Sequence, residues 1–219
     1  MCGRFTLTID INSVAKAFNV PVPPSQQTGP RYNIAPTQNV VTLLSNGAVH
    51  LDLLRWGLIP SWAKDESIGS KMINARAETL AEKASFKRLL TSKRCLVVAD
   101  GFYEWRKERS GKTPMYITLK DHEPFAFAGL WDSWKSPDGE QIRTCTLITT
   151  EPNELVASIH NRMPAILSSE AQKEWLDSSL HDEHVLLPLL APYPAAEMTA
   201  RPVSRLVNNP QYDSAELIA

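Results

Sequence analysis

The stretch that decides the fold is residues 39–54, NVVTLLSNGAVHLDLL. Two runs rich in Val, Leu and Thr flank Asn46-Gly47, and an Asn-Gly pair between such runs is a strong signal for a two-residue hairpin turn. We therefore expect strands over residues 39–44 and 48–54, paired antiparallel. Working outward, four more β-rich runs follow along the chain, at residues 94–105, 115–119, 125–131 and 143–149.

Short helical patterns are interspersed with these strands. Apolar residues recur at helical spacing over residues 11–18, with Asp10 as a plausible N-cap. Further short helices are predicted at residues 79–90, where the pattern is basic and amphipathic, at 152–159 and at 168–176. We expect an α+β fold with a curved, mainly antiparallel, barrel-like sheet flanked by short helices.

The composition is that of an ordinary globular protein. The chain has 219 residues, 43% hydrophobic and 21% charged, without repeats or low-complexity tracts. The Pro-rich stretch 21–30 lies too near the N-terminus to separate two cores, so we expect a single domain over residues 1–219. No apolar run approaches the ~18 residues of a membrane span, and the first residues lack the pattern of a signal peptide. We expect a cytoplasmic protein without a membrane partner.

Three cysteines, at positions 2, 95 and 145, argue against a disulfide framework and for a reducing compartment. The net charge of -1 at first argues against a nucleic-acid partner. However, residues 1–110 carry 15 Lys+Arg against 9 Asp+Glu, a net +6, and residues 111–219 carry 8 against 15, a net -7. This split predicts a local positive groove on an otherwise acidic body.

The first four residues, Met1-Cys2-Gly3-Arg4, carry the most chemistry. Removal of Met1 would leave Cys2 with a free α-amine and a thiol on adjacent carbons. Both groups have ordinary pKa values near 8, so this pair can capture an aldehyde as a thiazolidine or act as an N-terminal nucleophile on an amide. The alternative interpretation is an incidental cysteine at the start of the chain. Arg4 supplies a permanent cation for a phosphate or carboxylate.

Three further segments place polar side chains in confined settings. Asn74 and Arg76 lie two apart, so in an extended segment both side chains point the same way. Glu104 lies within the aromatic run Gly101-Phe102-Tyr103-Glu104-Trp105, where desolvation would raise its pKa and suit it to general acid or base catalysis. His160 ends a short helical pattern, where the helix dipole favours its protonated form. A strand-end Asn, a surface Arg, a structural ion pair and a surface histidine are the competing interpretations.

Two tryptophans near the 39–54 hairpin receive different assignments. Trp56 is expected in the core, whereas Trp62, which follows Pro60-Ser61, is the better candidate for exposure and for stacking an unpaired base. The pair His181 and His184 lacks cysteine partners or a recognisable metal spacing, so we predict no metal. We also expect no cofactor, because the nucleophile itself supplies the covalent step.

In this order, these segments closely resemble the SRAP (SOS response-associated peptidase) family of abasic-site processing proteins. The resemblance covers nearly the whole chain and runs through these stretches: residues 1–5, 31–36, 55–60, 74–79, 95–105, 160–164 and 202–204. Some family members carry an aromatic residue directly after the Trp62 position, whereas this chain has Ala63. A stacking or duplex-wedging contact at that position is therefore not carried over from the resemblance.

The resemblance implies that Cys2 forms a thiazolidine crosslink with an abasic site in single-stranded DNA. It assigns Asn74 to holding the N-terminal or sugar end, and Glu104 and His160 to proton transfer during ring opening, strand cleavage or crosslink reversal. It further implies DNA or pocket contacts for Arg4, Arg76, Pro36, Trp62, Thr149 and Arg162. Met1 removal would correspond to the peptidase activity.

Two rival functions remain open at this point. Glutamine amidotransferases with an N-terminal nucleophile also begin Met-Cys-Gly and would turn over an amide without forming a DNA adduct. A DNA-binding module without chemistry would bind intact and abasic single strands alike, independently of Cys2. Nothing in the sequence requires more than a monomer.

Overall fold

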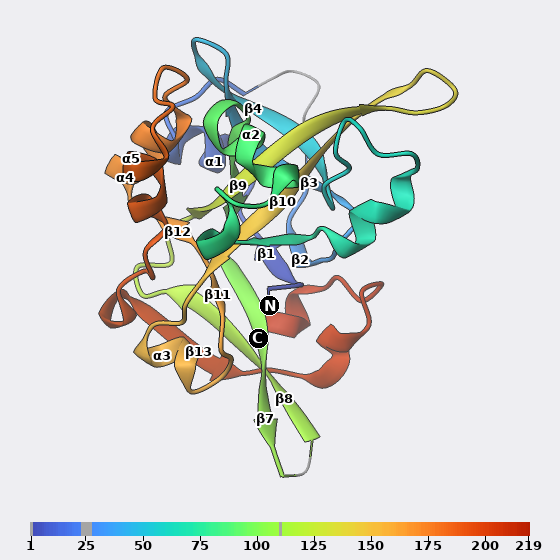
Figure 1. The fold of residues 1–219 in the computed structure, drawn as a ribbon. Helices are drawn as coiled ribbons and strands as arrows, with labels where there is room; N and C mark the ends of the chain where they lie inside the picture. The colour runs from blue at the N-terminus through green and yellow to red at the C-terminus, as the bar shows by residue number, and fades with distance from the viewer. Residues whose placement is uncertain (1, 23–27, 110) are drawn as a thin grey trace.

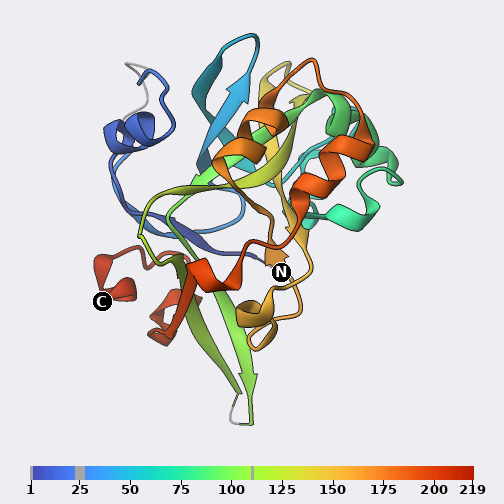
Figure 2. The same ribbon diagram turned by 90° about the vertical axis from the view of Figure 1, so that its left-hand side faces the viewer.

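The computed structural model describes residues 2–22, 28–109 and 111–219. Two sheets form the body (Figures 1 and 2). The first has the order β13-β8-β7-β1-β2, with antiparallel pairing throughout. Its strands are β1 (Phe5–Leu7), β2 (Arg31–Ile34), β7 (Gly101–Glu108), β8 (Gly111–Leu119) and β13 (Met198–Pro202).

The second sheet closes on itself. Strands β10, β4, β3, β6 and β9 pair in that order, and β9 pairs again with β10. All these pairings are antiparallel except β4 with β10. The result is a closed five-stranded barrel, which confirms the predicted barrel-like, mainly antiparallel sheet. Its strands are β3 (Asn39–Ser45), β4 (Val49–Trp56), β6 (Arg94–Ala99), β9 (Phe125–Lys135) and β10 (Gln141–Thr150).

Three short strands extend the barrel sheet at its edges. They are β5 (Asn74–Arg76), β11 (Met163–Pro164) and β12 (Ile166–Leu167). The α-helices are α1 (Ile11–Ala17), α2 (Ala84–Ser92), α3 (Glu154–Ala157), α4 (Ser169–Leu176) and α5 (Glu183–Leu186). Single turns of 3-10 helix fill several connections, at Glu66–Lys71, Ala77–Thr79, Leu187–Leu190, Ala195–Glu197, Arg205–Asn208 and Ala215–Ile218. Among the described residues, no helix is long and apolar enough to cross a membrane.

The predicted hairpin is confirmed. β3 and β4 pair from Asn39↔Arg55 to Ser45↔Val49, and Gly47 at the turn has φ +100°, a left-handed conformation that glycine adopts at little cost. Asp10 caps α1 by accepting hydrogen bonds from two backbone N–H groups, as predicted. Ser168 likewise caps α4 through a hydrogen bond from the Ala171 N–H.

Other boundaries predicted from the sequence were wrong. The run 94–105 is two strands, because the chain passes from the barrel to the other sheet between Ala99 and Gly101. A Cβ at Gly101 would lie 2.4 Å from the Tyr116 ring and hydroxyl, so only glycine lets the strand turn against that ring. The helix predicted over 79–90 begins instead after Lys83. The Pro-rich loop at 21–30 falls partly outside the described residues.

The hydrophobic core fills the barrel and the layer between the sheets. Phe5 of β1 contacts the rings of Trp56 and Phe127, with centroid separations of 5.2 and 5.7 Å. Trp56 is fully buried, which confirms its predicted place in the core. Cys2, Cys95 and Cys145 are free and buried. Because β1 packs against the core, the residues that precede it are held where the two sheets meet.

Candidate active site around Cys2

Cys2 lies three residues before the start of β1 and its side chain has no solvent exposure. The thiol donates a long hydrogen bond of 3.8 Å to the Arg4 carbonyl oxygen. Burial raises the pKa of this thiol well above its ordinary value, and the nearby negative charge of Glu104 raises it further. In the chain that still carries Met1, the thiol is therefore protonated at neutral pH and sheltered from solvent.

Asn74 contacts the backbone of Cys2. Its Nδ2 donates a 2.8 Å hydrogen bond to the Cys2 carbonyl oxygen. The Oδ1 of the same amide is buried and makes no hydrogen bond with any described residue. Asn74 belongs to β5, which lies parallel to β10 with Asn74 opposite Leu147. One half of the amide thus positions Cys2, and the other half is an acceptor available to a donor in the site.

Glu104 and His160 border the same site. Glu104, on β7, is 2% exposed, and its pKa is raised because burial disfavours the carboxylate, although a charge on His160 opposes this effect. The burial of this carboxyl group confirms the desolvation that the aromatic sequence context predicted. The two side chains line one cavity of about 530 Å³. This cavity also has Lys107 and Lys112 on its wall.

His160 follows α3 rather than ending it, because that helix stops at Ala157. The predicted interaction with the helix dipole is correspondingly corrected. The Arg162 backbone N–H and carbonyl oxygen lie 3.1 and 3.2 Å from His160 Nδ1, so the Arg162 backbone holds the imidazole ring in place.

Arg76 and Arg4 have opposite environments. Arg76, on β5, is exposed and shares a strand face with Asn74, as their two-residue spacing predicted. Arg4 points inward: its NH1 donates to Asn33 Oδ1 over 2.8 Å and to the Val207 carbonyl over 2.7 Å. Burial lowers the pKa of Arg4. This guanidinium therefore links the N-terminal residues to the C-terminal segment through internal hydrogen bonds.

Arg162 is also held by internal contacts. It forms a bidentate ion pair with Glu78, with N–O distances of 2.6 and 2.9 Å, and donates to the Thr149 carbonyl oxygen. The hydrogen bonds from Arg162 lower the pKa of Glu78. Thr149 is fully buried and pairs with Arg76 and Pro164 on its neighbouring strands. Thr149 and Arg162 thus hold the backbone beside the site in place.

Pro36 and Trp62 lie on loops. Pro36 is half-buried and precedes Thr37, which has φ +74°. Trp62 is 61% exposed, as predicted for this residue. Neither contacts Cys2 through a hydrogen bond, so both are candidates for ligand contact rather than chemistry.

Four residues in or next to the site were not singled out by sequence reasoning. Asn33, which is buried, orients Arg4, and Glu78 pairs with Arg162. Lys107 and Lys112 lie directly opposite each other on β7 and β8. Lys107 and Lys112 lie between the strands predicted at 94–105 and 115–119, so their cross-strand pairing did not follow from the predicted elements. The long-range contacts of Asn33 and Glu78 have no local sequence signal. Within the described residues, no group of three or more His, Cys, Asp or Glu side chains is placed to hold a metal ion.

Comparison with known proteins identifies the family. Residues 1–210 match the family described as SOS response associated peptidase (SRAP). The chain is 52% identical over 221 residues to the abasic site processing protein YoqW of Bacillus subtilis, covering 100% of this chain and 99% of that protein. It is 34% identical to the abasic site processing protein HMCES of Xenopus tropicalis, covering 100% of this chain and 78% of that protein.

A solved structure supports the same assignment. A crystal structure of a protein from Bacteroides thetaiotaomicron superposes with a TM-score of 0.91 at 30% sequence identity, covering 99% of this chain and 98% of that one. The fold, the ordered motifs and the relatives agree. The chain belongs to the SRAP family.

Proposed function

We propose that this protein processes abasic sites in single-stranded DNA by capturing their ring-opened aldehyde covalently on Cys2. The observation that carries the proposal is the convergence of a buried Cys2, the Asn74 amide at its carbonyl and the buried Glu104 carboxyl group. The names of the relatives, abasic site processing proteins, support the choice of substrate.

The chemistry requires prior removal of Met1, because in the printed chain the Cys2 nitrogen is a peptide amide. We propose that the protein removes Met1 itself. The freed α-amine then attacks the aldehyde carbon, and loss of one water gives an imine. Sγ bonds to that same carbon while the thiol proton passes to nitrogen, which closes a five-membered thiazolidine without an oxidant or cofactor.

The surrounding residues provide proton transfer and binding. With its raised pKa, Glu104 serves as the acid that opens the sugar ring and protonates the leaving hydroxyl. Once deprotonated, it is the base that takes the thiol proton and relays it to the nitrogen. His160 acts beside it in strand cleavage or crosslink reversal. The unpaired Asn74 Oδ1 accepts from the freed Cys2 amine or from a sugar hydroxyl. Exposed Arg76 pairs with a flanking phosphate.

Arg4, Thr149 and Arg162 shape the site in this scheme, and their existing internal contacts favour that role over direct phosphate binding. Pro36 and Trp62 contact the bases that flank the lesion. We propose that the chain works as a single domain and as a monomer, associated with DNA in the cytoplasm. The free state of all three cysteines is consistent with a reducing compartment.

The test is adduct formation on a single-stranded oligonucleotide with one abasic site, followed on a denaturing gel with and without borohydride. Wild-type protein lacking Met1 is expected to give an adduct that needs no reduction. Cys2→Ser retains the amine and forms an imine or the readily hydrolysed oxazolidine, so its adduct should require borohydride. A borohydride-independent adduct with Cys2→Ser in wild-type yield would refute the thiazolidine. It would leave a crosslink formed by another group of the protein, whereas no adduct with the wild type would leave a non-covalent DNA-binding module.

A further inference from the structure

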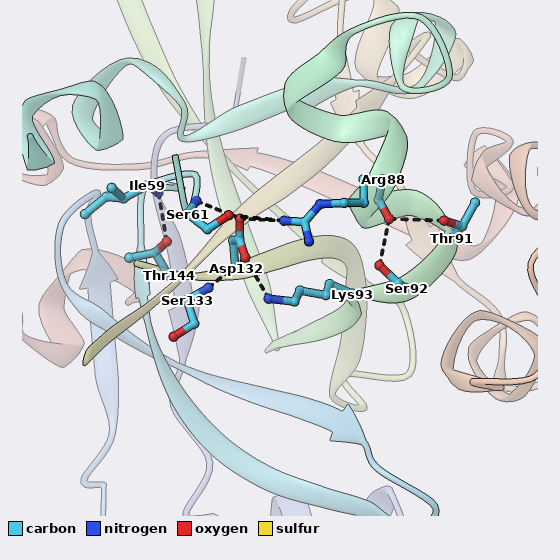
Figure 3. A network of polar contacts seen from close by, with 9 residues as sticks. All are labelled: Ile59, Ser61, Arg88, Thr91, Ser92, Lys93, Asp132, Ser133 and Thr144. Atoms are coloured by element: carbon cyan, nitrogen blue, oxygen red, sulfur yellow. Dashed lines mark hydrogen bonds and ion pairs between the residues drawn. The ribbon is translucent and has the colours of Figure 1, made fainter. Parts of the chain in front are cut away.

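Asp132, on β9, is a charged residue at the centre of a polar network outside the Cys2 site (Figure 3). It is 1% exposed. Its carboxylate accepts hydrogen bonds from Lys93 Nζ at 2.7 Å, from the Ser61 N–H at 2.8 Å and from Arg88 NH2 at 3.4 Å. Burial opposes ionisation, but the hydrogen bonds from Lys93 and from the Ser61 and Ser133 N–H groups lower the pKa of Asp132. The buried carboxylate therefore joins the loop after β4 to helix α2.

This loop, residues 57–63, is fixed on both sides of Trp62. Ahead of it, the Ile59 N–H donates to Thr144 Oγ1 over 2.8 Å and the Ser61 N–H binds Asp132. Behind it, Trp134 Nε1 donates to the Ala63 carbonyl over 2.7 Å. Yet the Trp62 side chain is 61% exposed. A rigid backbone thus presents a large aromatic ring to solvent. Because the backbone is already held in place, little further conformational freedom is lost when the ring binds a ligand.

A cation contacts the loop one residue ahead of this ring. The Arg88 side chain is 62% exposed, and its Nη2 is 3.2 Å from Ser61 Oγ. Residues 83–94, which include α2, contain five Lys or Arg and no Asp or Glu. An exposed aromatic ring on a loop that a positively charged element contacts suits the binding of an unpaired base and its phosphate.

The loop also continues directly into the Cys2 site. The Leu58 N–H donates to the Met72 carbonyl over 3.1 Å, and Trp56 Nε1 donates to the Ile73 carbonyl over 2.8 Å. Asn74, the next residue, holds Cys2. A strand bound at Cys2 can therefore reach the loop within a few nucleotides.

We propose that Arg88 extends the contact already assigned to Trp62 into a subsite for one whole flanking nucleotide, and that Asp132 is the positioning residue that fixes both the Trp62 loop and Arg88. The base stacks on Trp62, and its phosphate pairs with Arg88. Asp132 contacts no DNA and acts by holding Ser61 and Arg88 in place. This inference rests on the proposed function for the choice of DNA as ligand.

The test measures affinity for an intact single-stranded oligonucleotide by fluorescence anisotropy across a salt series, which requires no crosslinking. Trp62→Ala should weaken binding about fivefold or more without changing the salt dependence. Arg88→Ala should lower the slope of log affinity against log salt by about 0.7, the value for one phosphate contact on a single strand. Lys16→Ala, which removes an exposed cation on α1, is the control and should change neither quantity.

Asp132→Asn tests the positioning role through a comparison of backgrounds. It should weaken binding about fivefold in the wild-type background and cause no further loss in the Trp62→Ala, Arg88→Ala double variant. An equal loss in both backgrounds would overturn the positioning role, because Asp132 would then act elsewhere. If Asp132→Asn fails to fold, the variants of the two exposed residues still test the subsite. Wild-type affinity in Trp62→Ala, or an unchanged salt dependence of affinity in Arg88→Ala, would overturn it.

The outcomes separate this inference from the proposed function. Absence of any adduct with the wild type on an abasic strand would contradict the Cys2 chemistry. It would leave the affinity comparison on intact strands fully interpretable. Conversely, a normal adduct with unchanged affinities in the variants would overturn only the subsite.

Discussion

Replacement of Asn74 by alanine removes the side chain that holds the reacting end of the chain. The lost contact is the 2.8 Å hydrogen bond from Nδ2 to the Cys2 carbonyl oxygen. Cys2 has no solvent exposure. Leaving a buried acceptor unpaired costs about 1–3 kcal/mol. If this cost falls on the reacting geometry, adduct formation slows by roughly 5- to 150-fold, since ~1.4 kcal/mol corresponds to a factor of ten.

The assay is the single-turnover rate of adduct formation with Met1-free protein in excess over an abasic oligonucleotide, followed on denaturing gels. Asn39→Ala removes an exposed amide on β3 and is the matched control, expected to react at the wild-type rate. Thermal melting checks that Asn74→Ala remains folded. A folded Asn74→Ala variant that reacts within twofold of the wild type would refute the role assigned to this amide.

Three further predictions concern the buried charges and the backbone. Glu104→Gln should slow adduct formation at least tenfold and raise the melting temperature at pH 7.5. The folded state raises the Glu104 pKa, so the wild type loses stability as pH rises from about 4.5 through the pKa of Glu104 in the folded state. A gain in melting temperature at pH 4 equal to that at pH 7.5 would contradict this reasoning. Arg162→Ala should destabilise the fold by ~1 kcal/mol near pH 7, allowing for the solvent exposure of Glu78. Because Arg162 lowers the Glu78 pKa, this difference should shrink as pH falls below the ordinary range of a glutamate, and chemical denaturation at pH 7 and pH 3 measures it. Gly101→Ala should lower the melting temperature by roughly 2 to 12 °C, because its Cβ would lie 2.4 Å from the Tyr116 ring; an unchanged melting temperature would show that the ring can move away freely.

Local signals predicted a large part of this fold. The Asn46-Gly47 turn and the helix caps at Asp10 and Ser168 satisfy backbone groups within a few residues, so the sequence around them is sufficient. The sequence predicts a single strand over residues 94–105, because residues with strand propensity continue on both sides of Asp100. Its break depends on the distant Tyr116 ring and on Asp100 accepting from Thr6 and Thr8, contacts that no local pattern encodes.

The site divides in the same way. Exposure of Trp62 and burial of Glu104 follow from neighbouring residues and were predicted. The internal pairing of Arg4 with Asn33, and of Arg162 with Glu78, joins segments 29 and 84 residues apart. Charge counting along the chain treats all these arginines as available for phosphate, whereas the structure leaves Arg76 exposed and uses the other two for support.

The most direct test of the central claim is the mass and position of the DNA adduct on Met1-free protein. Intact-mass measurement should give the sum of protein and abasic oligonucleotide less one water, with no reducing agent present. After nuclease and trypsin digestion, the DNA remnant should lie on the peptide Cys2-Gly3-Arg4. A remnant on a lysine, or no adduct without reduction, would contradict covalent capture by Cys2.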